Sequence, residues 1–271
     1  MLEWLGSALG AAAALGFSAR WNWWRSKAYG LPVLMYHKIG TPPHGSKLRS
    51  LWVSPENFRK QVSWLLLHGF KTVTFSDLAA HAHSDTPLPE KPVLITFDDG
   101  YKNNIQLAFP ILSELGAKGN IFLVHDTIGT HNAWHDPESE SWVPMLTWDE
   151  IRQMLASGVM DFGSHTMTHA NLTKVSLDSA AWEMRESKAR LEDKLGREMA
   201  CFAYPYGAGA FVPDIRKRAL EAGYLFDFSV RQGIAPWPWD RNSGPLKRLF
   251  IRGDDLMLDF SLQLTRGKSR F

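Results

Sequence analysis

Short apolar runs alternate along most of the chain with segments in which apolar residues recur every three or four positions. The runs predict buried β-strands and the periodic segments predict amphipathic helices, and their alternation indicates βα units around a parallel sheet. We expect strands at residues 32–36, 71–75, 92–97, 120–124, 159–163, 200–204, 225–230 and 246–252. Wrapped around one core, these units predict an α/β fold, a (β/α) barrel of about seven strands, complete or incomplete.

Capping residues delimit the helices between these strands. Ser54 and Pro55 open a helix that Gly69 closes, and residues 147–150 form a capping box for another. We expect further helices at residues 76–83, 103–115, 176–195 and 213–222, and a long loop at residues 126–146.

Polar residues follow several of the expected strands directly. His37, the pair Asp98–Asp99, His165 and the segment 204–206 each stand at the carboxyl end of an apolar run. Barrel enzymes keep their active sites at this end of the strands. The sequence therefore predicts one site built from these residues.

Composition narrows the classes of function. With 271 residues, 45% of them apolar, the chain can form one large domain and is not a disordered protein. A net charge of +2 with well-mixed signs gives no indication of a nucleic-acid partner. Because Cys201 is the single cysteine, disulfides are excluded and a metal site must use His, Asp or Glu.

The first 27 residues differ from the rest, so we separate a segment 1–27 from a catalytic domain 28–271. Residues 2–19 are apolar apart from Glu3, and Trp, Arg and Lys cluster at residues 20–27. This arrangement resembles an interfacial belt and predicts association with a membrane. A packed first helix and a cleaved signal peptide are the alternatives. If residues 2–19 span the membrane, the basic residues place the domain on the cytoplasmic side.

Asp98 and Asp99 are adjacent carboxylates after an apolar strand. Neighbouring residues of an extended chain point to opposite sides, so one carboxylate can bind a metal while the other accepts a proton from water. His165 and His169 would share one face if residues 165–169 formed a helical turn, and could then bind the same ion. Two imidazoles and a carboxylate leave positions free for water, as a hydrolytic metal site requires. A polar turn and two surface histidines are the alternatives.

The segment Phe202–Gly207 reads on composition as a Pro-Gly turn. In an active site, the turn at Pro205–Tyr206 would offer a backbone N–H to an oxyanion. The aromatic side chains of the segment would offer a surface on which a sugar ring packs.

With these residues identified, the chain resembles the polysaccharide deacetylase family. Residues 96–100 (TFDDG) resemble its first motif, residues 164–169 (SHTMTH) its second and residues 204–207 (YPYG) its third, and residues 34–39 (LMYHKI) are similar to the opening strand of the poly-N-acetylglucosamine deacetylase branch. The resemblance implies a distorted barrel with fewer than eight units. It makes Asp98 the general base and Asp99, His165 and His169 the ligands of one divalent ion, Zn²⁺ or alternatively Co²⁺ or Ni²⁺.

Two departures from the family pattern concern the base and the acid. The Arg that orients the base in many members is replaced by Ala203, and no histidine follows His169 to serve as general acid. We expect His37 to supply the proton to the leaving amine, with His125 as the weaker substitute.

Other aromatic and histidine residues carry less information. Trp237 and Trp239, in a Pro-rich loop, pack locally or stack on sugar or membrane. We interpret the remaining histidines as solvated: His44, His68, His81, His83, His131 and His135. Of these, His131 and His135 could also lie at the edge of the cleft.

These observations predict a carbohydrate N-deacetylase that hydrolyses the N-acyl group, usually acetyl, of an amino sugar in a polysaccharide or glycan. One alternative is a deacetylase or deformylase of a lipid-linked amino sugar, and another is an inactive carbohydrate-binding relative. We expect no nucleic-acid partner and a membrane-associated location in a bacterial cell envelope.

Overall fold

Seven parallel strands form a closed barrel in the computed structural model, which describes residues 10, 16–21, 23–138 and 140–270. Around the ring they are β1 (Val33–Tyr36), β5 (Pro92–Phe97), β6 (Gly119–Leu123), β7 (Met160–Ser164), β8 (Cys201–Ala203), β9 (Phe226–Gln232) and β10 (Leu246–Phe250). The ring closes because β1 pairs with β10 on one edge and with β5 on the other. The expected (β/α) barrel of about seven strands is confirmed.

An eighth strand, β4 (Lys71–Val73), lies outside this ring. It pairs with residues 92–94 of β5, whereas β6 pairs with residues 96–97 of the same strand. The buried amide of Asn120 joins the three strands: its Nδ2 donates to the carbonyls of Val73 and Ile95, at 3.1 and 3.2 Å. The barrel is therefore distorted where β4 meets it.

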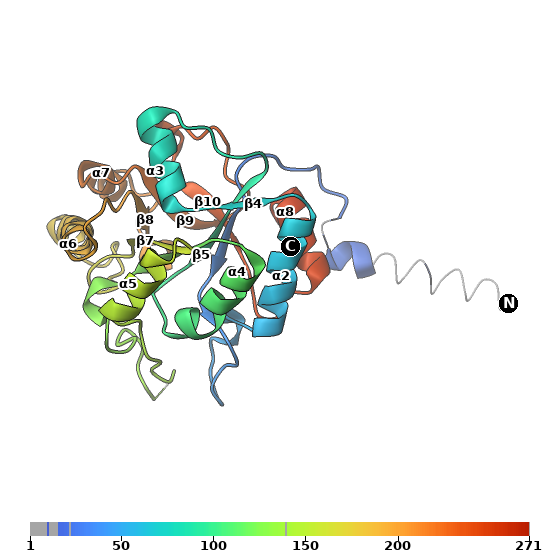
Figure 1. Cartoon of the computed structure of the whole chain (residues 1–271), viewed down its shortest axis with the longest axis horizontal. Coiled ribbons are helices and arrows are strands. Elements are labelled where there is room, and N and C mark those ends of the chain that lie inside the picture. Colours follow the sequence, from blue (N-terminus) through green and yellow to red (C-terminus); the bar gives the residue numbers. More distant parts are fainter. Residues whose placement is uncertain (1–9, 11–15, 22, 139, 271) are drawn as a thin grey trace.

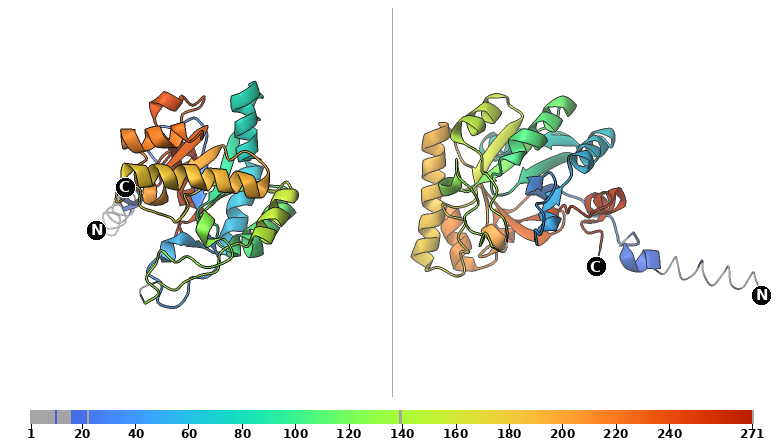
Figure 2. Two further views of the ribbon diagram at one scale, coloured as in Figure 1. Left: turned by 90° about the vertical axis from the view of Figure 1, so that its left-hand side faces the viewer. Right: turned by 90° about the horizontal axis from the view of Figure 1, so that it is seen from below.

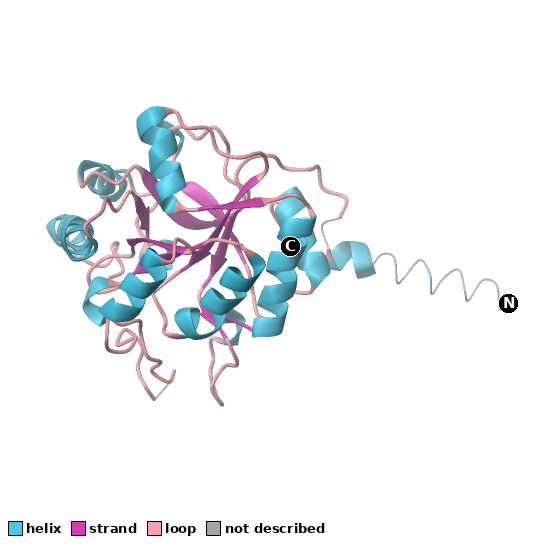
Figure 3. Cartoon of the chain, viewed as in Figure 1, coloured by secondary structure: helices cyan, strands magenta, loops and turns pink. Residues whose placement is uncertain are grey.

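Helices cover the outside of the barrel, with the strands at its centre (Figures 1 and 3). They are α2 (Pro55–Leu67), α3 (Phe75–Ser84), α4 (Phe109–Leu115), α5 (Trp148–Ala156), α6 (Leu177–Leu195), α7 (Pro213–Glu221) and α8 (Met257–Arg266). The expected caps of α2 and α5 form, with Ser54 accepting from the N–H of Asn57 and Thr147 exchanging bonds with Glu150. Figure 2 shows α6 along one side of the barrel.

Several short elements escape the sequence patterns. A small parallel sheet joins β2 (Lys38–Ile39) to β3 (Trp52–Val53), and a π-helical turn (Asn104–Ala108) precedes α4. These pieces have five residues or fewer, too short for a periodic pattern. Of the loop expected at residues 126–146, the first two residues belong to a 3-10 turn (His125–Thr127), and the described residues of 128–146 form the loop, with isolated bridges from His131 to Pro144 and from Met145 to Tyr101.

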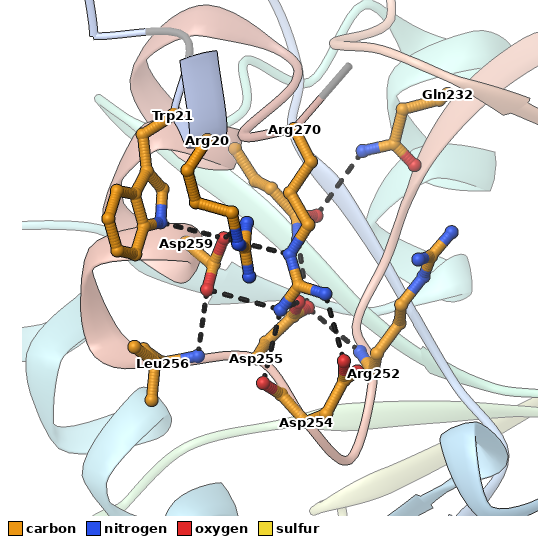
Figure 4. A network of polar contacts seen from close by, with 10 residues as sticks. Arg20, Trp21, Gln232, Arg252, Asp254, Asp255, Leu256, Asp259 and Arg270 are labelled. Carbon is orange, nitrogen blue, oxygen red and sulfur yellow. Dashed lines mark hydrogen bonds and ion pairs between the residues drawn. The ribbon is translucent and has the colours of Figure 1, made fainter. Parts of the chain in front are cut away.

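The described part of the amino-terminal segment packs on α8. Residues 16–20 are helical, and Arg20 and Trp21 donate to Asp259 at 3.3 and 3.1 Å. Figure 4 shows that Arg270, near the end of the chain, also binds Asp259, together with Asp254 and Asp255. Within the described ranges we find no helix that could cross a membrane. Most of the apolar stretch 2–19 lies outside the described residues.

Candidate active site

Three side chains from two strand ends converge on one point. Asp99 follows β5, and His165 and His169 follow β7. The Nε2 atoms of His165 and His169 lie 3.4 and 3.2 Å from Oδ1 of Asp99, and all three side chains are buried. One ligand atom from each lies within 4.8 Å of the other two, close enough to hold a single ion.

The backbone between the two histidines is not helical, so the expected helical turn is wrong. Thr166 and His169 adopt left-handed conformations, with φ of 72° and 64°. Glu183, on α6, fixes this loop by accepting hydrogen bonds from the N–H groups of Met167 and Thr168, at 2.9 and 3.0 Å. A loop rather than a helix thus turns both imidazoles toward Asp99.

Partners behind the imidazoles set their orientation. Nδ1–H of His165 donates to the carbonyl oxygen of Ala203 at 2.7 Å, which leaves the lone pair on Nε2 facing Asp99. Nδ1 of His169 lies 3.0 Å from the hydroxyl of Tyr206, and Trp134 stacks on the His169 ring at 4.1 Å between centroids. Burial lowers the pKa of His169, which favours the neutral form that binds metals.

The donor set fits a divalent cation. Oδ1 of Asp99 is buried and has no hydrogen-bond partner among the described atoms. Burial raises the pKa of Asp99, but the facing histidines hold it well below its usual range, so the carboxyl group is charged. A buried carboxylate oxygen and two imidazole lone pairs that face one another need a cation between them.

Replacing Tyr206 with Phe should weaken metal binding about 10- to 100-fold, because partners of metal-bound histidines typically have effects of this size. Tyr206 is half exposed, so the fold should remain intact. Titration of the apoprotein with Zn²⁺ measures the change. Tyr29→Phe, at an exposed tyrosine outside the site, is the control, and equal affinities of the two variants would contradict the role of Tyr206.

Asp98 is held separately from this cluster, by an arginine that the sequence patterns did not reveal. Arg248, on β10, donates two hydrogen bonds to the two carboxylate oxygens of Asp98, at 2.6 and 2.8 Å, and its Nε donates to the carbonyl of Ser229. Both side chains of this pair are buried. Burial raises the pKa of Asp98, but the charges of Arg248, His165 and His37, together with the hydrogen bonds from Arg248, outweigh it and keep the pKa below its usual value. Asp98 is therefore a fixed, ionised carboxylate.

His37 lies on the other side of Asp98. Its Nε2 is 4.0 Å from Oδ2 of Asp98, and its ring packs edge-on against Phe250 at 6.0 Å between centroids. Burial lowers the pKa of His37, so it is neutral near pH 7. His125, the weaker candidate for the acid, instead pairs with Asp126 at 2.8 Å.

Comparisons with known proteins agree with this arrangement. The sequence model of the family described as polysaccharide deacetylase matches residues 85–226, just over half of the chain. The chain belongs to this family. The expectation of a polysaccharide deacetylase, a hydrolase, is confirmed.

Individual relatives are similar over most of the chain. YxkH of Bacillus subtilis is 30% identical over 205 residues, which are 76% of this chain and 66% of that protein. The poly-β-1,6-N-acetyl-D-glucosamine N-deacetylase of Staphylococcus epidermidis is 25% identical over 78% of this chain and 72% of its own length. The crystal structure of BC0361, a polysaccharide deacetylase from Bacillus cereus, has a TM-score of 0.71 at 28% identity, covering 89% of this chain and 69% of that one.

Described residues of the long loop 128–146 lie beside the candidate active site. Trp134 lies over His169, with 4.1 Å between ring centroids, and its ring centre is also 6.0 Å from that of His135. His131 instead stacks on Trp142, at 4.0 Å between centroids. Lys38 is almost fully buried, with its Nζ 4.4 Å from the ring centre of Tyr101.

The Trp-Pro loop lies at the other end of the barrel. Trp237 and Trp239 pack against Phe226, the first residue of β9, with centroids 6.5 and 5.2 Å apart. Because the site is at the carboxyl ends of the strands, these two rings have a packing role, the first of the two interpretations.

Proposed function

We propose that this deacetylase hydrolyses the N-acyl group, in the first instance N-acetyl, of an amino sugar in a polysaccharide or glycan, with one bound Zn²⁺. The observation that supports it is the convergence of Asp99, His165 and His169 beside an ionised Asp98. Asp99, His165 and His169 would hold a divalent ion, which would supply a water of lowered pKa and polarisation of the acyl carbonyl.

The remaining steps belong to side chains of the chain itself. Asp98, oriented by Arg248, accepts the proton of the attacking water. His37 is neutral at the start, and it receives this proton across the 4.0 Å that separates it from Asp98. It then donates the proton to the amine nitrogen as the carbon–nitrogen bond breaks. The backbone N–H of Tyr206, in the Pro205–Tyr206 turn, stabilises the oxyanion.

Release of acetate tests the proposal. We expect the purified protein to release acetate from N-acetylglucosamine oligomers, to lose this activity after dialysis against a chelator, and to regain it with Zn²⁺ better than with Co²⁺ or Ni²⁺. A parallel assay for formate on N-formylated oligomers distinguishes the acyl groups. Activity that is unchanged after the metal has been removed would disprove the metal-dependent reaction.

A second candidate is the same reaction on a lipid-linked amino sugar at the membrane of a bacterial cell envelope. It is favoured by the exposed rings of Phe17, Trp23 and Trp24, of which the two tryptophans closely precede Arg25 and Lys27 in the sequence. The double variant Trp23→Ser/Trp24→Ser keeps the contacts of Arg20 and Trp21 with α8. A loss of activity on vesicle-bound substrate, but not on soluble oligomers, would support this candidate.

A further inference from the structure

A groove of about 740 Å³ adjoins the candidate active site. Its lining includes Gly40, Arg49, Trp52, Phe250, Arg252 and Asp254, from the small β2–β3 sheet and the β10–α8 loop. This volume is in the range of ligand sites, roughly 300–1,000 Å³.

The groove borders the candidate site, because two of its lining side chains contact His37 and the neighbouring Lys38. Phe250 packs on the ring of His37, and Trp52 lies 5.3 Å from Nζ of Lys38. A substrate whose N-acyl group lay beside His37 would have space for its neighbouring unit over Phe250, in the groove.

The charge of this groove is positive. Its lining contains two arginines and one carboxylate, Asp254, which lies 2.9 Å from Arg270 and shares that guanidinium with Asp255 and Asp259. Arg49 and Arg252 are exposed, and neither guanidinium forms an ion pair with any described residue. Figure 4 shows the Arg252 guanidinium pointing away from the acidic residues that bind Arg270, although the backbone N–H of Arg252 donates to one of them, Asp255.

Arg252 is also held in place. Its Cζ lies 5.4 Å from the ring centre of Phe250, and its backbone N–H donates to Asp255 at 2.9 Å. The combined charge of the two guanidinium groups is larger than the single negative charge of a ligand carboxylate. It matches that of a phosphate monoester, which is about −1.5 to −2.

We infer that this groove binds a phosphate group on the unit next to the N-acylated sugar. The inference rests on the proposed function and specifies its substrate class: an amino sugar attached to a phosphate, in a polymer or on a lipid. The phosphate positions the substrate and takes no part in the bond cleavage.

Equilibrium binding tests the inference without depending on turnover. The probes are a neutral N-acetylglucosamine pentamer and the same pentamer with a phosphate monoester at its reducing end. Calorimetry on the Zn²⁺-loaded Asp98→Asn protein, in which we expect turnover to be suppressed, gives both dissociation constants. We expect the phosphorylated pentamer to bind at least tenfold more tightly, and this preference to decrease as salt is added.

Arginine variants identify the source of the preference. Arg49→Gln and Arg252→Gln should each weaken binding of the phosphorylated pentamer about 5- to 20-fold and leave the neutral pentamer within twofold. Arg185→Gln, at an exposed arginine of α6 on the far side of the barrel from α8, is the control of equal charge change. Equal binding of the two probes, or a preference that survives in the double variant Arg49→Gln/Arg252→Gln, would overturn the inference.

Vesicles distinguish the sources of the phosphate. The probe is polyprenyl-diphosphate-linked N-acetylglucosamine in neutral vesicles. If the arginine variants lose more affinity for this probe than for the phosphorylated pentamer, the result supports a lipid-linked substrate. If they lose more affinity for the pentamer, it supports a polymer. A loss of binding to sugar-free anionic vesicles, with the preference among pentamers unchanged, would assign the arginines to a membrane and refute the groove. If neither pentamer releases acetate with the unsubstituted protein, the proposed function fails, while the binding constants still decide the inference.

Discussion

Replacing Asp98 with Asn should lower kcat/KM on an N-acetylglucosamine oligomer by about 10²- to 10⁴-fold, the usual contribution of a general base. The amide cannot accept the proton of water, and it has nearly the volume of the carboxylate. Metal uptake should persist because Asp99, His165 and His169 are unchanged, and Asp98 lies outside that cluster.

Two measurements on the same preparation check this prediction: acetate release, and the metal content by elemental analysis. Asp126→Asn is the matched control, because Asp126 is also near a strand end but pairs with His125 instead. An Asp98→Asn protein that turns over at the native rate would remove Asp98 from the mechanism. If the variant has lost the metal, Asp98 also contributes to metal binding, and its assignment as a base separate from the metal ligands is wrong.

Removing Arg248 should damage both stability and activity. Arg248 and Asp98 are a buried ion pair with two hydrogen bonds, and deleting one partner of such a pair typically costs about 3–5 kcal/mol. Arg248→Met leaves the Asp98 charge buried without its partner. We expect a free energy of unfolding lower by about this amount, and a kcat that falls with the orientation of the base.

Arg216→Met provides the comparison for Arg248→Met. Arg216 binds the buried Asp227 with two hydrogen bonds, at 2.8 and 3.1 Å, but this pair lies on α7 and β9, and neither residue is Asp98 or one of the three proposed metal ligands. Denaturant unfolding should show that both variants are destabilised, whereas only Arg248→Met should lower kcat per folded molecule. Equal kcat values would show that Arg248 stabilises the barrel without orienting the base.

The elements that sequence predicted well are those with strong local signals. Buried strands such as β5 and β6 are continuous apolar runs, and the caps of α2 and α5 are formed by Ser54 and Thr147. Asp99, His165 and His169 were found because strand ends in a parallel barrel meet on one face. Their proximity follows from topology and needs no detail of the loops.

The parts that sequence missed depend on long-range geometry. Arg248 reaches Asp98 across 150 residues of sequence, because β10 closes the ring next to β1. Its one local signal was a charged residue within a strand expected to be buried. The loop at Thr166 and His169 was mistaken for a helical turn because left-handed conformations of residues other than glycine leave no mark in composition. Hydrogen bonds from the N–H groups of Met167 and Thr168 to Glu183, and from the N–H of His169 to the hydroxyl of Thr166, hold this loop.

The closed ring of strands also links the site to folding. The proposed ligands come from the ends of β5 and β7, the carbonyl that orients His165 from β8, and the arginine that holds Asp98 from β10. No fragment that lacks the last strands contains the complete arrangement, so the site arises only with the finished barrel. An ion that binds the native chain alone would shift the folding equilibrium toward it, by an amount that grows with the concentration of free ion. For a cell that synthesises this protein, metal supply would then determine how much of it persists as well as how fast it works.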